Sequence, residues 1–202
     1  MSKLLKLKPV VSYTTRPKRS SETEGVEHYF IKPEEAKNIM EKEQVIAYTK
    51  IGEIEYFATI EALNGSNVYI IDPKGLTYLR EHCGNLHLLV IYIETMDSIR
   101  MKRAQKRDNA DFLAAFEKRN AAENDQFTEF EKSKDWDWKV ENNFDYPHAA
   151  IRRLTEYIKL TSFGREEDEA PILYCIVGRT GSGKDYLTSQ AIKYFEENPV
   201  EL

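Results

Sequence analysis

A glycine-rich run near the C-terminus has the residue types and the spacing that bind phosphate. After the apolar stretch 172–177 the chain continues with Gly178, Arg179, Thr180, Gly181, Ser182, Gly183 and Lys184. This run fits the pattern G-x-x-x-x-G-K between a strand and a helix, in which backbone N–H groups curl around phosphate oxygens. We therefore expect a phosphate-binding loop (P-loop) in which Lys184 reaches the β and γ phosphates of a nucleotide. The alternative interpretation is a glycine-rich turn.

The position after the lysine departs from this pattern. A Ser or Thr usually follows the lysine and ligates Mg²⁺, whereas this chain has Asp185. A carboxylate is also a ligand for Mg²⁺. We expect Asp185 to hold Mg²⁺, so that the metal site is altered without being abolished.

A second group of anion-binding side chains lies near the N-terminus. Arg16 and Arg19 follow a strand-like stretch and lie among several hydroxyl groups. Guanidinium groups form paired, charge-assisted hydrogen bonds to phosphate oxygens, so this cluster suits a phosphomonoester. By itself it could equally be a solvated turn. Together with the P-loop it indicates a second phosphate site, and two such sites suggest phosphoryl transfer between two nucleotides.

A third group of basic residues is spaced to share one helix face. Arg100, Arg103 and Arg107 stand at positions i, i+3 and i+7 of a predicted helix. Like charges arranged in this way repel unless an anion lies between them, and an ATP phosphate chain is the expected anion. The alternative is a solvated basic face. Glu123 and Asp125, on the next predicted helix, are expected only to balance charge.

Hydrophobic periodicity predicts the elements that position these residues. Expected strands cover 8–13, 27–31, 45–49, 55–59, 68–72, 86–93, 138–141 and 172–177. Expected helices cover 33–42, 73–83, 96–107, 110–132, 147–159 and 184–197, with Gly84 capping the second. This alternation is typical of an α/β fold with a mostly parallel sheet and helices on both faces. The polar segment 161–171 is expected to be a linker or an ordered surface loop.

Composition limits the partners. The 202 residues carry a formal net charge of −5, which disfavours a long nucleic acid as partner. The longest apolar run, 86–93, is too short to span a bilayer, and Lys3, Lys6 and Lys8 interrupt any signal peptide. Two cysteines make neither a disulfide framework nor a metal site. We expect a cytoplasmic monomer or homodimer that binds no membrane.

The run from Ser12 to Gly25 strongly resembles the GMP-binding signature of guanylate kinases, S-x-T-T-R-x-x-R-x-x-E-x-x-G. The similarity continues through 45–48, 55–59, 69–75 and 144–158. The resemblance implies a P-loop NTPase three-layer fold and Mg²⁺-dependent transfer of phosphate from ATP to a nucleoside monophosphate, GMP or dGMP. It implies one domain, 1–202, with a core of 1–12, 65–102 and 133–202, an NMP-binding subdomain of 13–64 and a lid of 103–132.

The same resemblance implies roles for single residues. The catalytic residues would be Lys184, Arg16, Arg103, Arg107 and Arg119. The monophosphate site would comprise Ser12, Arg16, Arg19, Glu22, Tyr56 and either His28 or the neighbouring Tyr29, and Asp72 keeps one of two acidic positions.

Two base-reading positions depart from the family, since they carry Ala47 and Ala58, and the first of the two acidic positions on the core strand is Ile70. A same-fold kinase for another nucleotide and a non-catalytic guanylate-kinase-like binding domain are therefore the alternatives.

The order of the motifs also departs from the family. There the P-loop comes before the GMP-binding signature, and here it closes the chain. Joining Leu202 to Ser2 restores the usual order, so the chain resembles a circular permutant whose two ends should lie close together. The alternative is exchange of the P-loop segment between two chains.

Overall fold

A parallel sheet in the order β5-β8-β6-β7 forms the core of the protein. The computed structural model describes residues 4–20, 22–108, 112–143, 147–163 and 171–201. The strands of this sheet are β5 (Val68–Ile70), β6 (His87–Glu94), β7 (Trp138–Glu141) and β8 (Ile172–Val177). Strand β8 is apolar throughout because helices cover both faces of the sheet.

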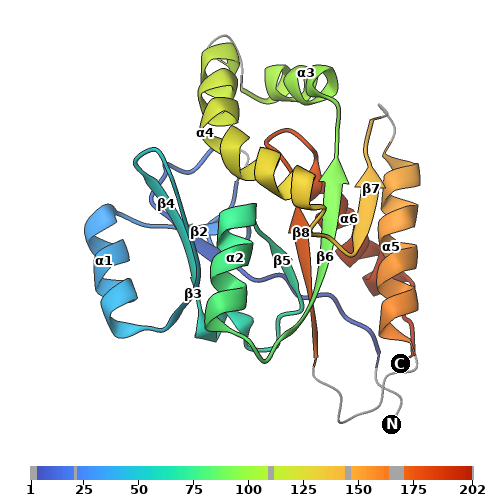
Figure 1. The fold of residues 1–202 in the computed structure, drawn as a ribbon. Helices are drawn as coiled ribbons and strands as arrows, with labels where there is room; N and C mark the ends of the chain where they lie inside the picture. Colours follow the sequence, from blue (N-terminus) through green and yellow to red (C-terminus); the bar gives the residue numbers. More distant parts are fainter. Residues whose placement is uncertain (1–3, 21, 109–111, 144–146, 164–170, 202) are drawn as a thin grey trace.

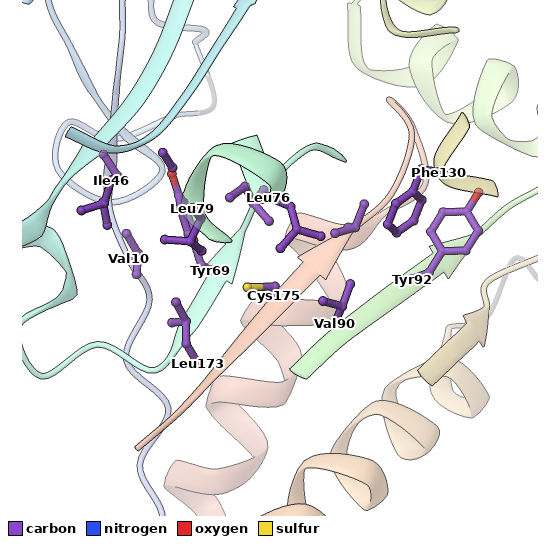
Figure 2. Close-up of a cluster of buried hydrophobic side chains, with 14 of the residues drawn as sticks. Val10, Ile46, Tyr69, Leu76, Leu79, Val90, Tyr92, Phe130, Leu173 and Cys175 are labelled. Atoms are coloured by element: carbon purple, nitrogen blue, oxygen red, sulfur yellow. The ribbon is translucent and has the colours of Figure 1, made fainter. Parts of the chain in front are cut away.

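The two faces of the sheet form two hydrophobic clusters. Cys175 and Val177 contact one cluster and Tyr174 and Ile176 the other, since successive side chains of a strand point to opposite faces. Helices α2 (Pro73–His82) and α4 (Phe112–Ser133) pack in the first cluster, and α5 (His148–Ser162) and α6 (Lys184–Glu197) in the second. Figure 1 shows the sheet between these pairs, and Figure 2 shows the first cluster. The predicted α/β fold is confirmed.

A second sheet, in the order β2-β1-β4-β3, lies beside the core (Figure 1). Its strands are β1 (Ser12–Thr14), β2 (His28–Phe30), β3 (Val45–Ile51) and β4 (Ile54–Thr59). Only β1 and β2 run parallel, so this smaller sheet is mixed. The remaining helices are α1 (Pro33–Lys42), a short 3₁₀ helix (Ile60–Leu63) and α3 (Asp97–Asp108).

Three sequence-based expectations need correction. The strand expected at 8–13 is shorter, since β1 begins only at Ser12. Before it, Pro9 forms an isolated bridge with Val68 of the core sheet, because this segment passes from one sheet to the other. The cap of α2 is Cys83 and not Gly84, since the Cys83 N–H donates to Leu79 O. Residues 161 and 162 belong to α5, so the expected linker begins later, and 164–170 lie outside the described residues.

The two described chain ends are joined in space. Leu4 and Glu201 form an antiparallel bridge, and the Leu5 N–H donates to Val200 O at 2.8 Å. Strand β8, from the C-terminal part, pairs with β5 and β6 of the same chain. Ser2 and Leu202 lie outside the described residues. The circular permutation itself stays a prediction. No helix within the described ranges is long and apolar enough to cross a membrane.

Candidate active site

One cavity of about 630 Å³ brings the two predicted phosphate sites together. Its walls come from both sheets, from the loop between β8 and α6, and from α4. Of the residues singled out in the sequence, those that line it are Ser12, Arg16, Arg19, Glu22, His28, Ala47, Tyr56, Ile70, Asp72, Arg119, Glu123, Gly178, Thr180, Gly181, Lys184 and Asp185.

The P-loop joins β8 to α6 and requires glycine where it bends most. Gly181 and Gly183 have φ values of +79° and +83°, in the left-handed region that disfavours other residues. A Cβ atom at Gly181 would lie 2.8 Å from Arg100 O, and one at Gly183 would lie 2.7 Å from Asn142 Nδ2. The glycine spacing is thus imposed both by the turn and by the packing of α3 and Asn142 against it.

Two of the three arginines predicted to share one helix face bind the P-loop and do not line the cavity. Arg100, only 1% exposed, donates from Nη1 to Thr180 O at 2.9 Å. Arg103 donates from Nη1 to Ser182 O at 3.1 Å, beside Asn142 Nδ2, which donates to the same oxygen at 2.8 Å. The interpretation as a solvated basic face is therefore wrong for both arginines. The side chain of Arg107 lies outside the described residues.

At the second predicted phosphate site, Glu22 organises the two arginines. Its carboxylate accepts from Arg16 Nη1 and Nη2 at 2.7 and 2.6 Å and from the Arg19 backbone N–H at 2.8 Å. Burial acts to raise the pKa of Glu22, but the hydrogen bonds and charges of Arg16 and Arg19 outweigh it and lower the pKa to about 2. Glu22 is therefore ionised and positions the guanidinium groups.

Of the two neighbouring candidates on β2, His28 lines the cavity and Tyr29 does not. His28 Nδ1 lies 2.9 Å from Ser12 Oγ, whereas Tyr29 packs at a tilt against Tyr13 on the other face of the sheet, with ring centroids 5.1 Å apart. Burial, reinforced by the positive charge of Arg16, lowers the pKa of His28 to about 4. His28 is thus a neutral hydrogen-bonding group near pH 7.

This pKa predicts a pH dependence of stability. Between pH 6.5, the ordinary value, and pH 4 the unfolded chain binds a proton on His28 that the folded chain does not bind. Stability should therefore fall as the pH falls through this window, by up to about 3 kcal/mol from this residue. In His28→Gln, urea unfolding measured from pH 7 to 4.5 should show a correspondingly shallower loss. An unchanged slope would remove His28 as the cause.

Sequence reasoning missed the role of Glu123. Its side chain is buried on α4, where its carboxylate accepts from Thr180 Oγ1 at 2.8 Å and from Arg119 Nε at 2.6 Å. Burial acts to raise the pKa of Glu123, but the positive charges of Arg119 and Lys184 outweigh it and lower the pKa. The expectation that Glu123 only balances charge is wrong. The i, i+4 spacing from Arg119 was the available signal.

The acidic residue Asp72 has a structural role besides lining the cavity. Its Oδ1 accepts from the Gly75 N–H at 3.0 Å, which caps α2, and from Thr49 Oγ1 at 2.8 Å. Of the two departing alanines, Ala47 lines the cavity, whereas its cross-strand partner Ala58 is fully buried and does not line it.

Asp185 is the residue of the cavity that was predicted to bind a metal ion. Asp185 lies in the first turn of α6 and lines the cavity. Among the described residues, no group of three or more His, Cys, Asp or Glu side chains could hold a metal ion. A single carboxylate suits Mg²⁺, which is commonly bound by one or two carboxylates together with substrate phosphates.

Comparison with known proteins gives consistent matches. A protein-family model described as "Guanylate kinase" matches residues 3–159. A guanylate kinase of Polaromonas sp. is 23% identical over 142 residues, 67% of this chain and 66% of that protein. One from Blochmanniella floridana is 33% identical over 84 residues, 38% of this chain and 40% of that protein. The matched part thus spans less than two thirds of these relatives' own length.

A solved structure shares the fold. The crystal structure of guanylate kinase from Anaplasma phagocytophilum aligns with a TM-score of 0.54 and 16% identity, covering 78% of this chain and 77% of that chain.

Proposed function

This chain belongs to the guanylate kinase family, and from that premise we propose that it transfers the γ-phosphoryl group of ATP to a nucleoside monophosphate, GMP or dGMP. The observation that carries the proposal is the shared cavity, which is lined both by Lys184 of the P-loop and by Arg16, Arg19 and Tyr56 from the other predicted phosphate site. A cavity that holds two sets of phosphate-binding groups suits direct transfer between two nucleotides.

In this proposal the chain acts by positioning and by charge. The loop 178–185 binds the ATP phosphates, and Lys184 stabilises the charge of the transferring group. Ser12, Arg16, Arg19, His28 and Tyr56 bind the acceptor phosphate, with Glu22 orienting the arginines.

Arg119 lies between the two phosphate sites, whereas Arg103 contributes by holding the loop. Mg²⁺, when bound, neutralises the phosphate charge, and Asp185 is the residue that would hold it.

The test is a panel of nucleoside monophosphates mixed with ATP and Mg²⁺. ADP should form only when an acceptor is present, with the acceptor diphosphate as the second product. ADP release at the same rate without any acceptor would contradict phosphoryl transfer. A cytoplasmic location and a monomeric or dimeric state remain predictions.

A second candidate function is a kinase with a weaker preference for guanine. Ala47 supports it, because it presents only a methyl group to the cavity at a base-reading position of the family. Leaving a buried polar group without a hydrogen-bond partner costs about 1–3 kcal/mol of binding free energy. A carboxylate at position 47 would accept from the N–H groups of guanine and would stay unpaired with adenine.

We expect Ala47→Glu to raise the ratio of kcat/KM for GMP over AMP by about tenfold or more, because the new carboxylate can accept from guanine N–H groups. The matched control is Ala149→Glu, the same change at an exposed position of α5 away from the cavity, which should leave the ratio nearly unchanged. If the unaltered chain already prefers GMP by several hundredfold, other residues read the base.

The circular permutation is proposed on two grounds, the motif order and the bridge between Leu4 and Glu201. We expect a chain that is rejoined between Leu202 and Ser2, and opened within 164–170, to fold with at least the stability of the original. Chemical denaturation of both chains measures this. A rejoined chain that is unfolded, or much less stable, would contradict the permutation.

A further inference from the structure

Glu123 connects three parts of the cavity wall that come from different regions of the chain. Its carboxylate accepts from both the backbone N–H and the hydroxyl of Thr180 in the P-loop, at distances of 2.8–3.1 Å. It also accepts from Arg119 Nε, one helical turn earlier on α4. Arg119 in turn donates from Nη1 to Tyr56 Oη of the second sheet at 3.2 Å.

This connection fixes the direction of the Arg119 guanidinium. Glu123 holds Nε on the P-loop side, and Tyr56 holds Nη1 on the acceptor side. The guanidinium also lies 5.6 Å from the centre of the Tyr56 ring. Among the described residues, no acceptor is recorded for Arg119 Nη2, which leaves that nitrogen as a donor for an anion between the two phosphate sites.

The charges explain why a carboxylate is tolerated in a site for phosphates. Glu123 is only 4% exposed, and its charge is balanced by Arg119 and Lys184. A buried carboxylate that accepts from three donors, the N–H and hydroxyl of Thr180 and Nε of Arg119, holds its partners in one geometry. Removing the carboxylate would leave the guanidinium held only by Tyr56, so that its direction would no longer be fixed from the P-loop side.

We propose that Glu123 is a positioning residue for phosphoryl transfer, which acts by locking Arg119 between the P-loop and the acceptor phosphate. The role rests on the proposed kinase function. It differs from simple support of the P-loop, because it is exerted through Arg119 and should affect the transfer step more than nucleotide binding.

The experiment is a double-mutant cycle of Glu123→Gln and Arg119→Ala, with kcat and both KM values measured for ATP and GMP. Glu123→Gln should lower kcat by about 10²-fold, the effect of a misplaced catalytic group, while both KM values change less than about threefold. In the Arg119→Ala background the same substitution should lower kcat by less than about twofold, since its partner is already absent.

A matched control is Asp125→Asn, which removes a carboxylate from an exposed position of the same helix and should retain the original kcat. If Glu123→Gln does not fold, Glu123→Asp replaces it in the cycle. Its shorter carboxylate cannot reach both partners, so kcat should fall by about tenfold.

Two outcomes overturn the inference: an equal loss of kcat with and without Arg119, or a raised KM for ATP at unchanged kcat. The latter would mean that Glu123 only supports the loop. Failure of the unaltered chain to phosphorylate any monophosphate would instead refute the proposed function, and this role with it.

Discussion

Lys184→Ala is expected to reduce kcat by about 10³-fold or more, because it removes the positive charge that faces the transferring phosphoryl group. Lys184 is the first residue of α6 and lines the same cavity as Arg16 and Arg19. Arg100 and Arg103 do not replace this charge, since both donate to carbonyl oxygens of the loop and neither lines the cavity. The measurement is ADP formation from ATP at saturating GMP.

The control for this variant is Lys193→Ala on the same helix. Lys193 is 64% exposed and pairs with Glu197 at 3.7 Å, so its removal should change kcat little. Equal turnover of Lys184→Ala and the unaltered chain would remove the P-loop from the mechanism.

Arg16→Lys is expected to raise KM for GMP by about 10²-fold, while KM for ATP changes less than about threefold. A lysine keeps the charge but cannot make the paired hydrogen bonds that join Arg16 to Glu22 at 2.6 and 2.7 Å. Without these paired bonds, neither the new lysine nor Glu22 is held in the geometry that the acceptor site requires. Moreover, Arg16 Nε is a buried donor without an acceptor among the described residues, and a bound phosphate would satisfy it.

Steady-state kinetics with each nucleotide varied in turn measure this effect. The control is Arg152→Lys, the same change in an exposed ion pair on α5, where Arg152 is 73% exposed. If Arg16→Lys raised the two KM values equally, the residue would support the cavity as a whole and not the acceptor site.

The family, the fold class and most of the elements followed from the sequence alone. The helix at 33–42 was predicted with its observed bounds, because Pro33 opens it and acidic residues occupy its first turn. The P-loop was equally readable, since its glycines, its lysine and the preceding apolar strand are neighbours in the chain. These features depend on local conformation and on hydrophobic periodicity, which a linear sequence contains.

What the tertiary structure decided concerns partners that are far apart in the chain. Arg103 and Ser182, or Glu123 and Thr180, meet only because β8 inserts between β5 and β6 and carries the P-loop to α3 and α4. The tertiary structure also decided between His28 and Tyr29 as the residue of the phosphate site. The pairing of β1 with β2 places His28 at the cavity and Tyr29 on the other face of the sheet. Charge alone could not tell a solvated arginine from one that holds a loop, because burial and hydrogen-bond partners arise only when distant segments pack.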